Sequence, residues 1–376
     1  MSISRYFGSK LTKIGYSLYD VTVVQAPLGS IEHRADVDPF VEICERKVYP
    51  IFVSPMSSVT DEKNYKIWIE HKLTPVVPRS IKQNITFDDR IKMAEETFVS
   101  ISLQEADDLL NFQINKIKKK IYICIDIANG NLESLYEKCK KLKQKFDSKI
   151  SIMTGNCANS KIYTYYAENG IDWMRVGIGI GSRCITSCNT SIYTPPATLL
   201  DELNQMKMNW AKEHNGEIPT KIILDGGIRN FDDIQKALAL GADAVMSGNI
   251  FAKAEEACGE VKYAINIDNC IKGDCISIEE YNCLNDEKKG LFKPFRDYYG
   301  MSTKRAQNIV NGSATRTSEG ISKPVPVEYP IAKWTDNMES YLRSAMTYTN
   351  SRNIKEFQEN AEVIILGGSG DLCYRK

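Results

Sequence analysis

The sequence of 376 residues contains no run of about 18 apolar residues, the length that a membrane-spanning helix needs. It also lacks a net charge, because 48 Lys and Arg residues balance 48 Asp and Glu residues. A chain without a net charge has no overall electrostatic field to attract nucleic acid or an anionic membrane at long range. Its first residues show no apolar core followed by a cleavage site, so no secretory signal is expected. We therefore expect a cytoplasmic protein with neither nucleic acid nor a membrane as its partner.

Regular cysteine spacing is missing as well. The 11 cysteines are scattered, and none of them forms the Cys-x2-Cys pair of a zinc site, which disfavours both a disulfide framework and zinc. The three histidines, His33, His71 and His214, fall outside every motif described below, so we assign them no catalytic role. The chemistry must then come from thiols, hydroxyls and carboxylates.

Short β-branched runs recur along the chain with amphipathic segments between them. Continuous apolar strands that alternate with helices indicate a parallel sheet covered on both faces. Eight such units predict a (β/α)8 TIM barrel, whereas a doubly wound sheet, the alternative, seldom needs eight evenly spaced units. The predicted strands are Ile51–Val53, Thr74–Val77, Phe98–Ile101, Ile121–Ile125, Ile150–Met153, Trp173–Val176, Lys221–Leu224 and Ala244–Met246. The predicted helices include Asp61–His71, Gln104–Lys119, Leu132–Phe146, Pro196–His214 and Phe231–Leu240.

The spacing of these units places the irregular segments. We interpret residues 1–376 as one barrel domain with a long catalytic loop after strand six. After strand eight, residues 253–297 form an inserted flap or hairpin that carries four of the cysteines. Residues 336–376 are expected to form a C-terminal helical tail.

The most informative stretch is the loop that follows strand six. Gly177, Gly179 and Gly181 occupy every second position, and glycine lets a backbone approach a ligand without a Cβ in the way. Cys184 and Thr186 follow, so the loop offers a thiol beside a hydroxyl. This pattern suits a nucleophile on a ligand-binding loop, although a glycine-rich turn with a small inert cysteine remains the alternative.

Loops after strands seven and eight of such barrels often bind phosphate. Here strand seven ends in Asp225-Gly226-Gly227 and strand eight in Gly248-Asn249. Both are glycine-containing turns that lead into helices, where exposed backbone amides can hold a phosphate, although either could be no more than a tight turn. Together they predict a nucleotide or sugar phosphate as the ligand.

The sequence resembles the family of inosine-monophosphate dehydrogenases and guanosine-monophosphate reductases. The segments that carry the resemblance are Gly179–Thr186 (the pattern Gly-x-Gly-Ser-x-Cys-x-Thr), Asp225–Ile228, Gly241–Gly248, Tyr299–Ser302 and Ser54–Met56. It is closer to the reductases, because the chain between Val77 and Phe98 leaves no room for the pair of regulatory domains usual in the dehydrogenases.

The resemblance implies reductive deamination of guanosine monophosphate (GMP) to inosine monophosphate (IMP) and ammonia, with NADPH as hydride donor. Cys184 would attack purine C2 as a thiolate, and Thr186 with Glu319 would deliver the proton that the departing amino group needs. The family also implies a homotetramer. It places a monovalent cation such as K+ on the carbonyl oxygens of Gly179, Gly181 and Cys184.

The resemblance also implies a substrate site and a cofactor site. The substrate residues would be Ser54, Met56, Ser182, Asp225, Gly226, Gly227, Gly248, Asn249, Tyr298, Met301, Ser302, Arg316, Ser318 and Gly320. The cofactor residues would be Asp126, Ala128, Asn129 and Arg79.

Several alternatives stay open at this point. Glu319 could be a solvated loop carboxylate, Asp126 an N-cap, and Cys188 a bystander or a redox partner of Cys184. The family's usual His-Lys pair after strand two is replaced around Arg79, which leaves NADH open as the donor. IMP dehydrogenation, a modified or deoxy guanine nucleotide, and a non-catalytic nucleotide-binding barrel are the other functions that the sequence allows.

Overall fold

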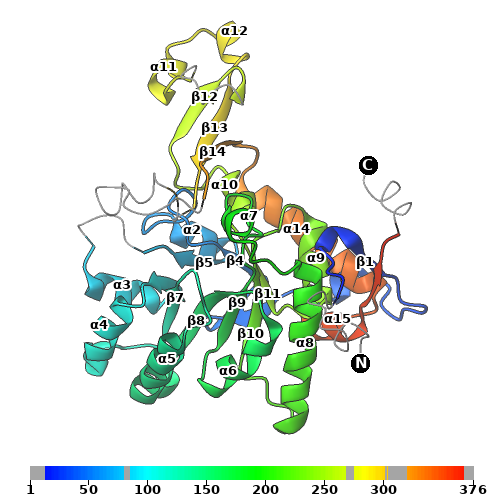
Figure 1. The fold of residues 1–376 in the computed structure, drawn as a ribbon. Helices are drawn as coiled ribbons and strands as arrows, with labels where there is room; N and C mark the ends of the chain where they lie inside the picture. The colour runs from blue at the N-terminus through cyan, green and yellow to red at the C-terminus, as the bar shows by residue number, and fades with distance from the viewer. Residues whose placement is uncertain (1–12, 80–84, 268–274, 301–302, 304–319, 368–376) are drawn as a thin grey trace.

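A computed structural model describes residues 13–79, 85–267, 275–300, 303 and 320–367 (Figure 1). Within these residues, eight parallel strands form a closed barrel in which each strand pairs with the next and the last pairs with the first. The (β/α)8 barrel is therefore confirmed over the doubly wound sheet. The barrel strands are β4 (Ile51–Val53), β5 (Thr74–Val77), β6 (Phe98–Ile101), β7 (Ile121–Asp126), β8 (Ile150–Cys157), β9 (Trp173–Val176), β10 (Lys221–Asp225) and β11 (Ala244–Ser247).

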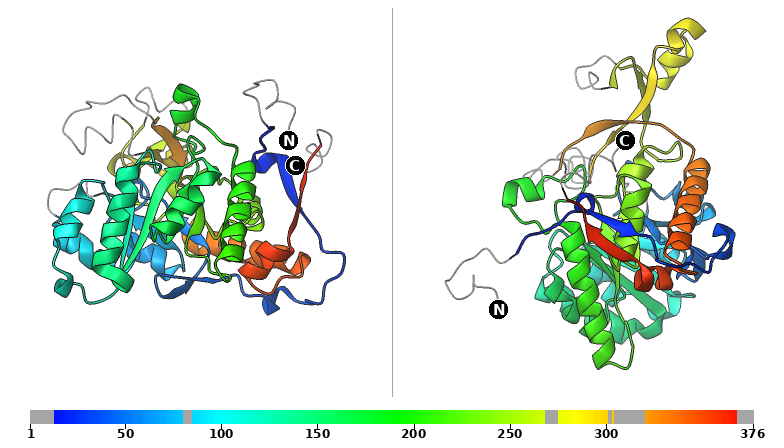
Figure 2. Two further views of the ribbon diagram at one scale, coloured as in Figure 1. Left: turned by 60° about the horizontal axis from the view of Figure 1, so that its bottom comes forward. Right: turned by 90° about the vertical axis from the view of Figure 1, so that its right-hand side faces the viewer.

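Helices surround the barrel, as Figures 1 and 2 show. They are α2 (Tyr65–Glu70), α3 (Phe87–Ala94), α4 (Glu105–Asn111), α5 (Glu133–Phe146), α6 (Tyr163–Glu168), α8 (Pro196–Glu213), α9 (Phe231–Ala239) and α10 (Asn249–Ala252). The helix predicted from Asp61 begins later, because the Asp61 carboxylate accepts from the backbone N–H groups of Lys63 and Asn64 and forms a turn first. The helix predicted over Gln104–Lys119 ends at Asn111, since Phe112 adopts an extended backbone.

Aromatic side chains fill the barrel interior. Phe52 lies edge-on to Phe98 and to Trp173, with ring centroids 5.8 and 5.3 Å apart. The hairpin of β2 (Val41–Ile43) and β3 (Arg46–Val48) adds Ile43 and Val48 to the same buried cluster. Apolar packing thus closes one end of the barrel. The other end, where the strands finish, is available for a functional site.

A sheet of three antiparallel strands projects from the barrel (Figure 1). This flap sheet consists of β12 (Val261–Ala264), β13 (Lys293–Tyr298) and β14 (Lys323–Pro326). The short helices α11 (Ile278–Asn282) and α12 (Asp286–Lys289) lie at its outer end. The segment 253–297 supplies two of the three strands, and the third strand comes from beyond it.

The two ends of the described chain meet on one side of the barrel. The tail is helical over α14 (Ile331–Tyr348) and α15 (Ile354–Asn360) and then forms strand β15 (Glu362–Ile365). Strand β15 pairs antiparallel with β1 (Val21–Val24), and Figure 2 shows the two side by side. Among the described residues, no helix has the length and apolar character to cross a membrane.

Candidate active site

The loop after β9 folds back on the short helix α7 (Thr186–Thr190). Gly177 and Gly179 have φ angles of 117° and 72°, values that favour glycine. A Cβ on Gly179 would overlap Ser187, whose hydroxyl donates to the Gly179 carbonyl over 3.1 Å. This glycine therefore serves the packing of the loop on α7, in addition to any approach to a ligand.

The predicted nucleophile and its hydroxyl partner lie in contact. The half-buried Cys184 thiol donates to Thr186 Oγ1 over 3.2 Å. Cys184 forms an isolated antiparallel bridge with Gly320, and the Ile321 N–H donates to the Arg183 carbonyl over 3.0 Å. The segment that carries the other predicted site residues thus returns to this loop at Gly320. Met301, Ser302, Arg316, Ser318 and Glu319 lie outside the described residues.

Three loops converge beside Cys184. A Cβ on Gly226 would lie 3.1 Å from the Gly181 amide nitrogen, and Ser182 Oγ donates to Asn249 Oδ1 over 3.5 Å. Gly226 and Gly227 have φ angles of 96° and 75°, so the turn after β10 requires glycine at both positions. We call the residues 181–182, 226–227 and 248–249 the cradle.

The cradle is closed on one side by the loop after β4 and by the flap sheet. The Tyr298 hydroxyl donates to Met56 Sδ over 3.3 Å. A Cβ on Gly248 would lie 2.5 Å from both of these atoms, so glycine is needed for this close approach. Ser54 is buried, and its N–H donates to the Ser247 carbonyl over 3.1 Å. The predicted substrate residues that the structure describes therefore gather around one point.

Sequence reasoning missed Arg175, a strand residue that is only 6% exposed. Its guanidinium binds Asp126 Oδ1 at 2.8 Å and Asp225 Oδ2 at 2.7 Å, and the Asn156 amide donates to Asp225 Oδ2 at 2.8 Å. Burial alone lowers the pKa of Arg175, but Asp225 and Asp126 outweigh it and raise this pKa well above its usual value. An arginine within the apolar run Trp173–Val176 was the available signal, because a buried charge needs partners.

The predicted cofactor residues follow two barrel strands, β7 and β5, that are not neighbours. Asp126 ends β7, and Ala128 and Asn129 follow it in a turn in which Asn129 Oδ1 accepts from the Asn131 N–H over 3.1 Å. Arg79 follows β5, two strands away, and is half-buried. Asp126 is thus brought to the Arg175 network, whereas Arg79 lies at a separate position on the rim of the barrel.

Comparison with known proteins decides the family. The model of the IMP dehydrogenase / GMP reductase domain matches residues 103–372, which is more than half of the chain. The chain belongs to this family. It is therefore a (β/α)8 barrel of an oxidoreductase family.

Relatives from both branches of the IMP dehydrogenase / GMP reductase family are similar to the chain. The GMP reductase of Onchocerca volvulus is 28% identical over 353 residues, which cover 89% of this chain and 87% of the relative. The GMP reductase of Photobacterium profundum is 28% identical over 326 residues, covering 84% and 83%. The inosine-5'-monophosphate dehydrogenase of Aquifex aeolicus is 33% identical over 248 residues, covering 66% of this chain but only 45% of the relative.

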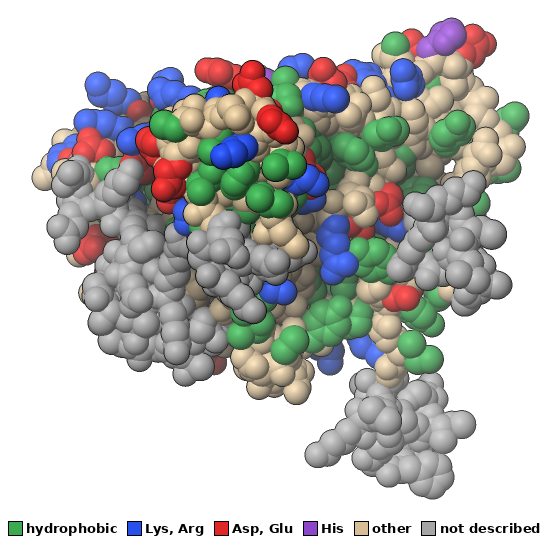
Figure 3. Space-filling model, turned by 90° about the horizontal axis from the view of Figure 1, so that it is seen from above, with side chains coloured by type: hydrophobic (Ala, Val, Ile, Leu, Met, Phe, Trp, Pro, Cys, Tyr) green, Lys and Arg blue, Asp and Glu red, His purple; other side chains and the backbone are tan. Residues whose placement is uncertain are grey.

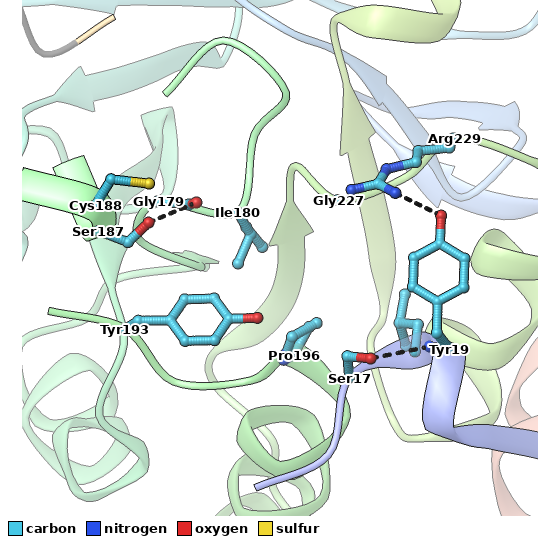
Figure 4. Close-up of a pocket in the computed structure, with 11 residues that line it drawn as sticks. Ser17, Tyr19, Gly179, Ile180, Ser187, Cys188, Tyr193, Pro196, Gly227 and Arg229 are labelled. Atoms are coloured by element: carbon cyan, nitrogen blue, oxygen red, sulfur yellow. Dashed lines mark hydrogen bonds between the residues drawn. The ribbon is translucent and has the colours of Figure 1, made fainter. Parts of the chain in front are cut away.

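A pocket of about 400 Å³ lies behind the loop after β9 (Figure 4). It is lined by Gly179, Ser187 and Cys188 and closed by the N-terminal segment, where Arg229 Nη1 donates to the Tyr19 hydroxyl over 2.7 Å. Its lining includes neither Cys184 nor Thr186, so it is distinct from the space over the predicted nucleophile. Cys188 lines this pocket, and its role as a bystander or as a redox partner of Cys184 stays a prediction.

Proposed function

We propose that the protein is a cytoplasmic GMP reductase that converts GMP to IMP and ammonia with NADPH. The observation that carries the proposal is the contact of Cys184 with Thr186 in the loop to which the chain returns at Gly320. Glu319 directly precedes Gly320 in the sequence. The match to reductases over nearly their whole length supports the same branch.

In the proposed reaction, the cradle holds the phosphate of the nucleotide. The Cys184 thiolate forms a bond to purine C2. The C2–N bond to the amino group then breaks, and Thr186 with Glu319 supplies the proton with which the amino group leaves as ammonia. The bound nicotinamide cofactor supplies the hydride that C2 gains. The C2–S bond breaks, and the electron pair returns to Cys184 as the thiolate.

The described residues fit both proposed accessory ligands. Asp126 ends a barrel strand and keeps 19% of its side chain exposed, so it can accept from a ribose hydroxyl of the cofactor. The Gly179 and Gly181 carbonyls each accept one hydrogen bond, from Ser187 and from the Cys184 N–H. A carbonyl oxygen has two lone pairs, and oxygen ligands of this kind suit K+.

The test is the loss of NADPH absorbance at saturating GMP and K+, with Cys184→Ala as the control. Oxidation of NADPH with formation of IMP and ammonia in the wild type, and none in the variant, is the expected result. NADH in place of NADPH measures the cofactor preference in the same assay. Sedimentation of the same sample tests the proposed homotetramer.

IMP dehydrogenation is the second candidate, because the dehydrogenase of Aquifex aeolicus shows the higher identity of 33% over the stretch that it shares. NADH formation from IMP and NAD, without NADPH oxidation by GMP, would replace the first proposal by this one. Failure of both reactions together with tight binding of a purine nucleotide would indicate an altered guanine nucleotide or a non-catalytic role.

A further inference from the structure

The cradle is short of positive charge. None of the described substrate residues given above is a lysine or an arginine. Arg175 is shared by Asp126 and Asp225, so this network carries more negative than positive charge. Figure 3 shows Lys and Arg side chains interspersed with Asp and Glu on the face seen from above. A phosphate dianion in the cradle therefore needs a cation close by.

Arg183 lies where such a cation is needed. It stands between Ser182 of the cradle and the nucleophile Cys184. Its guanidinium carbon lies 5.0 Å from the ring centroid of Tyr298, and the hydroxyl of this tyrosine lies next to Gly248. The stacked ring therefore holds the guanidinium at the edge of the cradle.

The donors of Arg183 are poorly used by the described residues. Its Nε is buried and has no hydrogen-bond partner among them, and Nη1 reaches only the Ser182 carbonyl at 3.4 Å. A buried donor without an acceptor is costly, and an anion bound in the cradle would remove this cost.

We propose that Arg183 is the cationic contact of the nucleotide phosphate and makes the site select phosphorylated over unphosphorylated purines. Its guanidinium can offer two parallel N–H groups to phosphate oxygens while it stays stacked on Tyr298. The inference rests on the proposed function only in that the ligand is a purine nucleotide. It requires neither NADPH nor turnover.

The experiment compares wild type with Arg183→Met, which keeps the length of the stem but removes the charge. Affinities for GMP and IMP are measured by calorimetry, and that for guanosine by competition. We expect both nucleotides to bind about 10- to 100-fold more weakly to Arg183→Met, with the guanosine affinity changed less than about twofold. Inorganic phosphate should likewise compete with GMP in the wild type and lose this ability in the variant.

Two further variants keep the test decisive. Arg183→Lys keeps the charge but not the paired donors and should recover part of the nucleotide affinity. This variant also replaces Arg183→Met in the comparison if Arg183→Met does not fold. Arg352→Met removes a charge from an exposed residue before α15 and should leave all affinities unchanged.

The possible outcomes are distinguishable. Equal losses of affinity for GMP and for guanosine in Arg183→Met would indicate a structural role for Arg183 and would overturn the inference. Unchanged nucleotide affinity would overturn it as well. Nucleotide binding that depends on Arg183 without NADPH oxidation would support the inference while the proposed reaction failed. A wild type that binds neither nucleotide would overturn both.

Discussion

The barrel and the flap sheet are built from strands of opposite character. Strands β4, β5, β6, β9 and β11 are buried along their whole length, because helices cover the outside and side chains fill the inside. The flap strand β12 is buried only at Ala264, and β14 only at Val325. The difference teaches that the barrel owes its stability to burial, whereas the outer strands β12 and β14 of the flap sheet can be altered with little loss of stability.

The largest effect is expected inside the barrel. Phe52→Ala removes a fully buried ring from its contacts with Phe98 and Trp173 and should lower the free energy of unfolding by about 4 kcal/mol. Urea unfolding measures the change, and Phe52→Leu should recover more than half of it. A loss below about 1 kcal/mol would show that the barrel interior collapses around the cavity and would break the comparison.

The buried network at the other end of the barrel should come next. Arg175→Met leaves Asp126 and Asp225 without their shared cation and should cost about 3 kcal/mol of stability. The same variant should weaken nucleotide binding, since Asp225 then keeps the Asn156 amide but loses the guanidinium that positions it. Thermal unfolding and calorimetry measure the two effects, and the double variant with Asp126→Asn should recover part of the stability. Unchanged stability would show that hydration of these two carboxylates compensates for the loss of the guanidinium.

A smaller, pH-dependent effect is expected on the outer layer of the barrel. Burial alone raises the pKa of Glu105, but the Ser102 N–H and Arg90 outweigh it and lower this pKa below its usual 4.5. The folded-state pKa then lies below that of the unfolded chain, so the stabilisation is present above pH 4.5 and is lost as the pH falls through the lowered value. Glu105→Gln should cost about 1.5 kcal/mol at neutral pH and flatten the loss of stability in acid, measured by urea unfolding across pH. An unchanged acid slope would contradict this assignment.

The smallest effect belongs to the flap. Tyr281 stacks on Tyr263 with ring centroids 3.8 Å apart, yet both lie on the projecting part of the molecule. Tyr281→Ala should cost about 1 kcal/mol or less in global unfolding, with any change confined to proteolysis of the flap. A global loss as large as that of Phe52→Ala would mean that the flap and the barrel unfold as one unit.

The same contrast explains what the sequence could predict. The barrel strands were located because burial on both faces favours apolar runs, as at Ile121–Ile125. Strand β14 was missed, because Pro324 and Pro326 disfavour a strand and its pairing partner β13 ends at Tyr298, far back in the sequence. Helix ends were predicted less well, since a single side chain such as Asp61 can delay them.

The candidate site was predictable to the extent that it is made of glycines and adjacent polar residues. The turns at Gly226 and Gly248 can be recognised by their residue types. In a (β/α)8 barrel, loops that follow the strands meet at one end of the barrel. Arg175 and Arg183 were not assigned roles, because their roles depend on partners from distant strands. Arg175 meets Asp126 and Asp225 only when the barrel closes.

The pairing of β1 with β15 has a consequence for synthesis. Val21 and Ile365 lie opposite each other although they are 344 positions apart (365 minus 21). At about 5–20 residues per second, β1 is synthesised roughly 17–70 s before its partner. Throughout that interval β1 has an unpaired edge, while the barrel between the two strands is being completed. Among the described residues, the last strand to be synthesised is therefore the one that pairs with the first.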